Sequence, residues 1–355
     1  MTQTARFTDS SCYHAALATL LNATEPDTDP FFVLGNNAAT AARLTADGEL
    51  TFSDPLEPLT SAFTRHGYRL THHPVRTGAD WRQALDTLRS GRAVAIAADA
   101  YHLEHYWVGF RTSHALHVVV LEDFDAATAT VRLVDPGEAV FHDGRIPVAR
   151  LTPAMCEGDA GQAWMEILPL DTGQTDAGAL PDLARQLSGD GIGDGDGDGD
   201  GGPWLSGTAL IRQLQRHLDT YLAVVGSRPR GSAGGTQQDW GPGPRLLLGL
   251  WWYHHTLRWL AGHLRNRTTD QVPGTGHVPG TAGVPGAEDA PAETVEQASR
   301  DLLVVRNLMM RLGAMDEHDE RFARFRAQLH PRLETTLRNL ESAAAALTAP
   351  AKEQQ

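Results

Sequence analysis

Cysteine, basic charge and long apolar runs are all scarce in this chain of 355 residues. Its two cysteines, Cys12 and Cys156, are too few for a disulfide framework and make a reducing compartment the default, although a single bridge between them stays open. Lysine and arginine number 30 against 44 acidic residues, so the net charge is −14 and no basic stripe is present. This charge balance excludes nucleic acids and anionic membrane surfaces as expected partners.

Membrane-spanning and secretory patterns are also missing. The most apolar stretch, residues 246–253, is followed at once by His254 and His255, so it is too short and too interrupted to span a bilayer. Residues 1–9 contain no apolar run before a cleavage site, which argues against a signal peptide. We therefore expect a cytoplasmic protein with no membrane partner.

Changes in composition divide the chain into two predicted domains. Residues 1–172 mix helical and strand-like patterns and predict an α+β domain in which an antiparallel sheet follows the first helices. Gly-Asp repeats cannot pack a core, so we expect a flexible linker over residues 173–202. Residues 203–347 predict an all-α helical bundle, interrupted by a disordered Val-Pro-Gly-rich insert at about 268–292. Its four apolar stripes cover 210–225, 246–264, 302–312 and 322–340.

The elements of the first domain follow from its local patterns. We expect one helix after Cys12 and another over residues 81–88. Strand-like runs lie at 93–97, 116–121, 130–134 and 163–168.

Cys12 stands where a helix is expected to begin. The preceding Asp9, Ser10 and Ser11 are residue types that cap helix N-termini, and an apolar segment follows them. The positive end of a helix dipole stabilises a thiolate, which is the nucleophilic form of cysteine. Position alone favours a buried, inert cysteine, because free cysteine is among the most buried residue types. The residues further along the chain favour a nucleophile.

A predicted β-hairpin supplies the partners that a nucleophilic cysteine needs. His117 opens its first strand and Asp135 closes its second, so antiparallel pairing brings the two side chains together. The carboxylate then fixes the tautomer of the imidazole, whose other nitrogen faces the nucleophile. His114, three residues before His117, is the competing candidate for the base. The strand-opening position favours His117, because a strand end is a rigid platform.

This layout resembles papain-like cysteine enzymes, and most closely the N-terminal domain of the butirosin biosynthesis protein H family. The matching stretches are Cys12-Tyr-His-Ala-Ala-Leu-Ala-Thr-Leu-Leu21, Phe32-Val-Leu-Gly35, 93–103 and 117–135. The resemblance covers about residues 8–168, and a helical domain often follows in that family, as it does here. It implies a papain-like fold with Cys12 as nucleophile, His117 as general base and Asp135 as the residue that orients it.

The resemblance also implies a reaction. In that family the acyl group arrives as a thioester on an acyl carrier protein, the cysteine forms an acyl-enzyme, and an amine of a small natural-product scaffold accepts the acyl group. The loop after Asp99 borders the catalytic cleft in the family, which makes Tyr101 a candidate for substrate contact. The backbone N–H of Cys12 would bind the oxyanion together with a second donor, for which Ser10 and Ser11 are candidates, and Ser11 is therefore also expected to contact the substrate.

Some residue patterns favour other interpretations. Leader-processing peptidases with this layout carry a glutamine six positions before the cysteine, where Arg6 stands here, so acyl transfer is preferred over proteolysis. His102, Glu104 and His105 are residue types that bind metals, but no third motif completes a ligand set. Exchange between a thiol and a thioester is nearly energy-neutral, so we expect neither metal nor cofactor.

Two alternatives stay open at this stage. The first is hydrolysis, in which a cysteine peptidase, amidase or thioesterase uses water in place of the amine. The second is a non-catalytic binding module that has kept a papain-like shape. The helical domain is expected to shape the acceptor pocket, receive the carrier protein or mediate self-association into a homo-oligomer.

Overall fold

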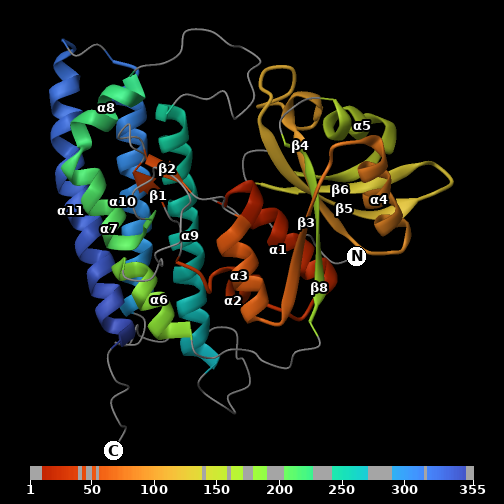
Figure 1. Cartoon of the computed structure of the whole chain (residues 1–355), viewed down its shortest axis with the longest axis horizontal. Coiled ribbons are helices and arrows are strands. Elements are labelled where there is room, and N and C mark those ends of the chain that lie inside the picture. Colours follow the sequence, from red (N-terminus) through yellow and green to blue (C-terminus); the bar gives the residue numbers. More distant parts are fainter. Residues whose placement is uncertain are drawn as a thin grey trace, which may run out of the picture. The chain divides into compact units, whose positions relative to one another are not determined.

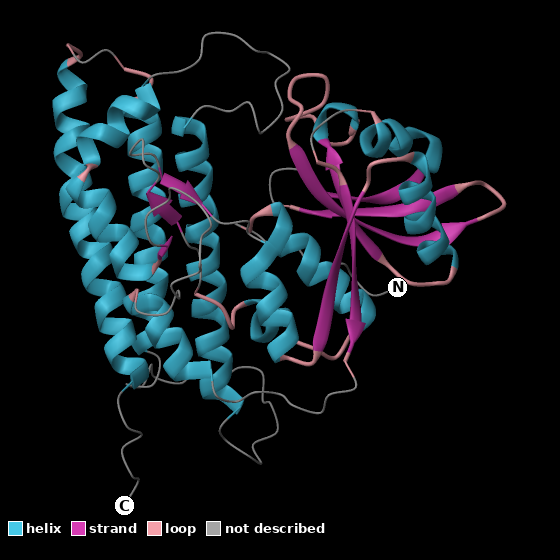
Figure 2. Ribbon diagram, in the orientation of Figure 1, coloured by secondary structure: helices cyan, strands magenta, loops and turns pink. Residues whose placement is uncertain are grey.

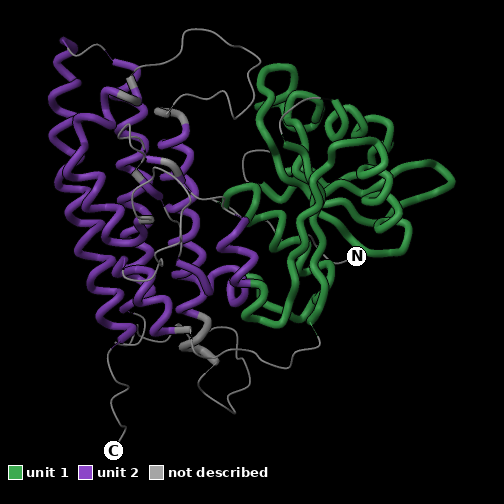
Figure 3. The backbone as a smooth tube through the Cα atoms, in the orientation of Figure 1, with its two compact units in different colours: residues 1–30, 63–174, 229–240 green, residues 31–62, 175–228, 241–355 purple. Residues whose placement is uncertain are grey.

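The computed structural model of the chain is α+β, with antiparallel strands and numerous helices (Figure 1). It describes residues 10–38, 42–44, 50–52, 56–137, 141–157, 161–170, 179–189, 204–226, 242–270, 290–315 and 318–348. These residues form two compact units (Figure 3). The sheet unit contains the described residues of 10–30 and 63–170, and the helical unit contains those of 31–62, 179–226 and 242–348.

A six-stranded antiparallel sheet is the centre of the sheet unit (Figure 2). Its strands, in the spatial order β3-β8-β4-β5-β6-β7, are β3 (Tyr68–Pro74), β8 (Ala163–Pro169), β4 (Val94–Asp99), β5 (Leu116–Asp125), β6 (Thr130–Pro136) and β7 (Phe141–Pro147). The four predicted strands are confirmed as β4, β5, β6 and β8. The two unpredicted strands, β3 and β7, lie at the edges and are largely polar, so neither has the apolar run that marks a central strand.

Helices pack against this sheet. They are α1 (Cys12–Thr24), α4 (Gly78–Arg89) and α5 (Val148–Cys156), with a short 3₁₀ turn, η1 (Ala100–His102), after β4. The helices predicted after Cys12 and over 81–88 are thereby confirmed. Every residue of α1 from His14 to Leu21 is buried, and the helix contacts β4, β5, β6 and β8. An apolar surface on all sides of a helix suits such a central position.

The helical unit is built from long amphipathic helices and a small sheet. The helices are α2 (Pro30–Leu34), α6 (Ala179–Ser188), α7 (Gly207–Arg216), α8 (Leu218–Gly226), α9 (Pro242–Asp270), α10 (Ala290–Leu312) and α11 (Glu320–Thr348); α3 (Leu56–Arg65) lies across the division between the units. Three predicted stripes are confirmed as α9, α10 and α11, whereas the first is divided into α7 and α8 at His217. The sheet, in the order β2-β1-β9, contains β1 (Ala42–Leu44), β2 (Leu50–Phe52) and β9 (Trp204–Leu205).

The predicted domain boundaries are wrong in two places. Helix α6 lies inside the predicted linker of 173–202, because Leu183 and Leu187 are fully buried and the helix packs against α11. The adjacent Gly-Asp repeats led us to predict the whole range as a linker, so this apolar stripe was missed. The rest of the predicted linker lies outside the described residues, at 171–178 and 190–203. The same holds for most of the predicted insert, at 271–289, whereas its two ends belong to α9 and α10.

The second boundary error concerns residues 31–62, which belong to the helical unit. The backbone carbonyl of Phe32 accepts a hydrogen bond from His263 Nδ1 at 2.9 Å, and Phe31 stacks on Trp259. A Cβ atom at Gly35 would collide with the backbone carbonyl oxygen of Trp259, so this close approach of α2 to α9 requires glycine. Such a pairing of distant segments has no signal in local composition.

Within the described residues, no helix has both the length and the apolar character needed to cross a membrane.

Candidate active site

Helix α1 begins at Cys12, as predicted, and Ser11 is its N-cap. The Ser11 Oγ accepts a hydrogen bond from the backbone N–H of His14 at 3.3 Å and lies 2.7 Å from Nδ1 of the same residue. Burial lowers the pKa of His14 to about 3, so its imidazole is neutral. The buried Ser11 side chain is thus occupied with capping and has little surface for the predicted substrate contact. Cys12 remains a free, partly exposed thiol.

The predicted juxtaposition of His117 and Asp135 is confirmed. His117 lies at the start of β5 and Asp135 near the end of the antiparallel neighbour β6. Their side chains form a hydrogen bond of 2.7 Å between Nε2 and Oδ2. Both residues are buried, with exposed fractions of 6% and 1%. This leaves Nδ1 as the ring nitrogen that is free to face another group.

The Cys12 thiol lies near enough to His117 to influence its pKa. Burial by itself lowers the pKa of His117, but the hydrogen bonds and negative charges of Asp135 and Cys12 raise it to about 9. Burial likewise raises the pKa of Asp135, yet its contacts with His105 and His117 lower it to about 2. At neutral pH, therefore, the imidazole of His117 is protonated.

Two residues that were not predicted for these positions complete the surroundings of the imidazole. His105 Nε2 lies 3.3 Å from Asp135 Oδ2, so this oxygen contacts two imidazoles. The Tyr106 ring stacks on the His117 ring at 3.8 Å between centroids. Burial, with the negative charges of Cys12 and Asp135, raises the pKa of Tyr106. Both residues lie in the irregular segment between η1 and β5, where no periodic sequence pattern predicts which side chains reach the site. The one available signal is the high density of histidine and tyrosine in this segment.

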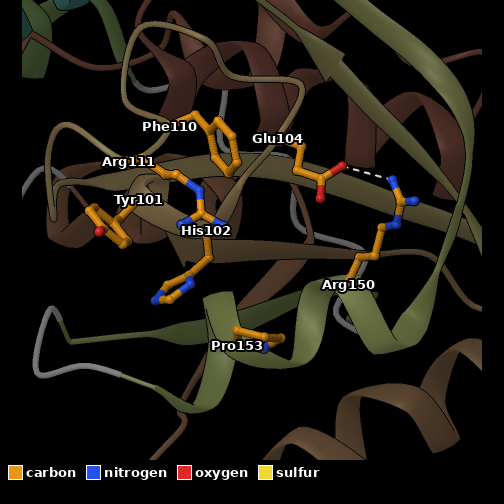
Figure 4. Close-up of a pocket in the computed structure, with 7 residues that line it drawn as sticks. All are labelled: Tyr101, His102, Glu104, Phe110, Arg111, Arg150 and Pro153. Carbon is orange, nitrogen blue, oxygen red and sulfur yellow. Dashed lines mark hydrogen bonds and ion pairs between the residues drawn. The ribbon is translucent and has the colours of Figure 1, made fainter.

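His114, the competing candidate for the base, contacts a different carboxylate. Its Nδ1 lies 2.8 Å from Oδ2 of Asp99, which is fully buried, and its ring stacks on Tyr101 at 4.3 Å. The hydrogen bond to Asp135 thus belongs to His117 and not to His114. Tyr101, the predicted substrate contact, lines a pocket of the sheet unit (Figure 4).

The segment considered as a metal site has other contacts. Glu104 forms an ion pair with Arg150, and His105 faces Asp135. Among the described residues, no group of three or more His, Cys, Asp or Glu side chains has the arrangement of a metal site. Cys156 is a free, exposed thiol whose pKa is raised by partial burial and by the nearby charges of Glu157 and Asp80. No disulfide joins it to Cys12.

Comparison with known proteins adds little to this geometry. No family profile matches the chain. The phosphonates import ATP-binding protein PhnC 1 of Synechococcus sp. (strain JA-2-3B'a(2-13)) is 35% identical over 75 residues, a stretch that is 21% of this chain and 27% of that protein. The chain therefore matches about a quarter of that relative's length. The present chain contains a single lysine, Lys352, and a glutamate follows it. The chain therefore lacks the Gly-Lys-Ser/Thr sequence of phosphate-binding loops.

The charged state of His117 predicts a pH dependence of stability. Its pKa rises from 6.5 to about 9 on folding, so its contribution to the free energy of unfolding is complete below pH 6.5 and is lost as pH rises through 9. The contribution of Asp135, whose pKa falls from 3.8 to about 2, is complete above pH 3.8 and is lost as pH falls through 2. We therefore expect the stability difference between the wild type and His117→Gln to be largest between pH 4 and 6.5.

Urea unfolding at half-unit pH steps measures this difference, since other titrating groups cancel between the two proteins. A difference that stays constant from pH 5 to pH 10 would contradict a protonated imidazole at this position.

Proposed function

We propose that the protein is a cysteine acyltransferase that moves an acyl group from an acyl carrier protein thioester to an amine in natural-product biosynthesis. The observation that carries this proposal is the buried hydrogen bond between His117 and Asp135, beside the partly exposed Cys12 thiol that also raises the pKa of His117. A partly exposed thiol at a helix N-terminus, paired with an imidazolium held by a buried carboxylate, is the arrangement that activates a nucleophilic cysteine. Resemblance to the butirosin biosynthesis protein H family supports acyl transfer as its use.

In the first half of the reaction, the Cys12 thiolate attacks the thioester carbonyl. The bond between that carbon and the carrier sulfur breaks, and the departing thiolate takes the proton of the His117 imidazolium. An acyl-Cys12 thioester and a free carrier thiol result. The backbone N–H of Cys12 is one of the N–H groups at the start of α1 that have no acceptor within the helix, so it is available to the oxyanion.

In the second half, the amine attacks the acyl-Cys12 carbonyl and His117, now neutral, accepts the amine proton. The carbon–sulfur bond to Cys12 breaks, which releases the amide and restores the thiolate–imidazolium pair. Asp135 keeps the imidazole oriented throughout. This cycle consumes no cofactor, and we place it in the cytoplasm. The helical unit would receive the carrier protein, shape the acceptor pocket or mediate self-association.

The geometry also bears on the non-catalytic alternative. A buried ion pair such as His117–Asp135 is weak as a source of stability, because desolvation of both groups offsets their attraction. Strongly shifted pKa values beside a half-buried thiol are typical of catalytic sites. These features favour an enzyme over a binding module that has only kept the shape.

Intact-protein mass spectrometry with acetyl-loaded carrier protein tests the proposal. The Cys156→Ala variant, in which Cys12 is the single cysteine, should gain one acetyl group, and Cys12→Ala should gain none. Addition of an amine should then remove the acetyl group as an amide. If water removes it as fast as amines at about millimolar concentration, the enzyme is a thioesterase or hydrolase. No acetyl gain, with the carrier still loaded, means that the transferase proposal is wrong.

A further inference from the structure

A pocket of about 240 Å³ lies in the sheet unit, lined in part by the segment that also carries His105 and Tyr106. Figure 4 shows Arg111, His102 and Tyr101 along one side and the Glu104–Arg150 ion pair on the other. Most of these residues belong to the segment that connects β4 to β5, and Arg150 comes from α5. The composition of this lining identifies what the pocket could bind.

The charges of the lining are not balanced. Glu104 and Arg150 neutralise each other through an ion pair of 2.7 Å. Arg111 forms no ion pair with any described residue, and its guanidinium lies 5.3 Å from the centroid of the Phe110 ring. The pocket therefore holds one uncompensated cation flanked by aromatic surfaces. This combination suits a carboxylate or phosphate, which the guanidinium binds through two parallel hydrogen bonds.

The backbone at Arg111 is fixed in an unusual conformation. Its φ angle of 54° lies in the left-handed region, which costs free energy for a residue with a Cβ atom. A hydrogen bond of 3.0 Å from the Arg111 N–H to the carbonyl of Tyr101 holds this turn. The segment thus keeps the guanidinium on the Tyr101 side of the pocket, as Figure 4 shows.

Short connections link this pocket to the candidate active site. Tyr101 stacks on His114, which contacts Asp99, and Asp99 is the β4 residue opposite Leu116, the neighbour of His117. The same segment carries Tyr106, which covers the His117 ring. The segment between β4 and β5 therefore supplies both most of the pocket lining and the ring that covers His117.

We propose that this pocket is an anion subsite in which Arg111 binds a carboxylate or phosphate of the acyl donor. The assignment to the donor rests on the acyltransferase function proposed above. The anion has two sources, the phosphate of the phosphopantetheine arm that carries the acyl group, or a carboxylate on the acyl group itself. The chemistry of recognition is the same for both.

Three small thioesters distinguish these sources in the Cys156→Ala background: acetyl-pantetheine is neutral, acetyl-4′-phosphopantetheine carries the phosphate, and succinyl-pantetheine carries a carboxylate. Arg111→Gln should reduce kcat/KM for one or both anionic donors about 10- to 100-fold, through KM, and leave the neutral donor unchanged. The matched control is Arg82→Gln, which removes an exposed arginine of α4 in the same unit. Equal losses for all three donors, or no loss for any, would overturn the subsite.

Calorimetric titration with succinate and with inorganic phosphate separates this inference from the acyltransferase proposal. The wild type should bind at least one of them, and Arg111→Gln should weaken that binding at least about tenfold. Anion binding that depends on Arg111, without any acylation of Cys12, would keep the subsite and refute the transferase. Acylation without detectable binding of either anion at about 10 mM would refute the subsite alone.

Discussion

Replacement of His117 by alanine is expected to slow the acylation of Cys12 by about 10³- to 10⁴-fold at pH 7. In the proposed mechanism, the variant loses the imidazolium beside Cys12, which is the proton donor for the departing thiol of the acyl donor. A stopped-flow assay with acetyl-pantetheine in the Cys156→Ala background measures this rate, because Cys12 is then the single reactive thiol. The loss should diminish at high pH, where an unpaired thiol ionises by itself.

The variant His114→Ala decides between the two candidate bases. His114 contacts Asp99 and not Asp135, so its removal should affect acylation far less than the removal of His117. If His114→Ala causes the larger loss, His114 is the base and the assignment of His117 is wrong.

The second large effect is expected at Asp135, on stability as well as on rate. Asp135→Ala removes a fully buried carboxylate whose Oδ2 lies 2.7 Å from His117 and 3.3 Å from His105, which leaves the buried imidazolium of His117 without its counter-charge. Loss of one partner from a buried ion pair costs about 3–5 kcal/mol. Without this carboxylate, burial dominates and the pKa of His117 falls, so less of the imidazole carries the proton that the proposed reaction needs at neutral pH.

Hydrogen–deuterium exchange of β5 and β6 measures this change within the sheet unit, independently of the helical unit. Asp143→Ala is the matched control, because its carboxylate pairs with Arg132 on the same sheet but is partly exposed, and such pairs contribute about 0–1 kcal/mol. If Asp135→Ala lowers the protection of β5 and β6 against exchange no more than Asp143→Ala does, the proposed structural role of the Asp135 carboxylate is wrong. Asp135→Asn should keep more of the stability but recover little of the rate, because an amide does not enforce the required imidazole tautomer.

The parts of this site that were predictable share one property, which is a strong local signal. Capping residues before an apolar run mark the start of α1 at Cys12, and two apolar strands around a polar turn mark the hairpin that joins His117 to Asp135. His105 and Tyr106 lack such a signal, because they reach the site from an irregular segment whose path depends on tertiary contacts. Their contacts with Asp135 and His117 depend on the tertiary path of this segment, and a periodic pattern in the sequence does not predict such a path.

The domain boundary shows the same limit at larger scale. Composition places residues 31–62 with the first domain, since nothing in their sequence separates them from their neighbours. Their partners in α9 are far along the chain, and 231 residues separate His263 from Phe32. Only the close approach at Gly35 reflects this pairing, and a glycine at that point of a sequence is equally typical of a turn or a helix end.

This interleaving of the two units sets the order in which the protein can mature on the ribosome. Residues 31–62 emerge early, yet the helical unit whose core contains Ala38, Ala42 and Leu50 is not complete until α11 ends at Thr348. About 290 residues separate the two points, a delay of about 15–60 s at typical rates of translation. During that time these apolar side chains lack the partners that bury them in the folded protein. The soluble yield of a variant therefore reports on late assembly, whereas its turnover reports on Cys12, and the two should not be expected to change together.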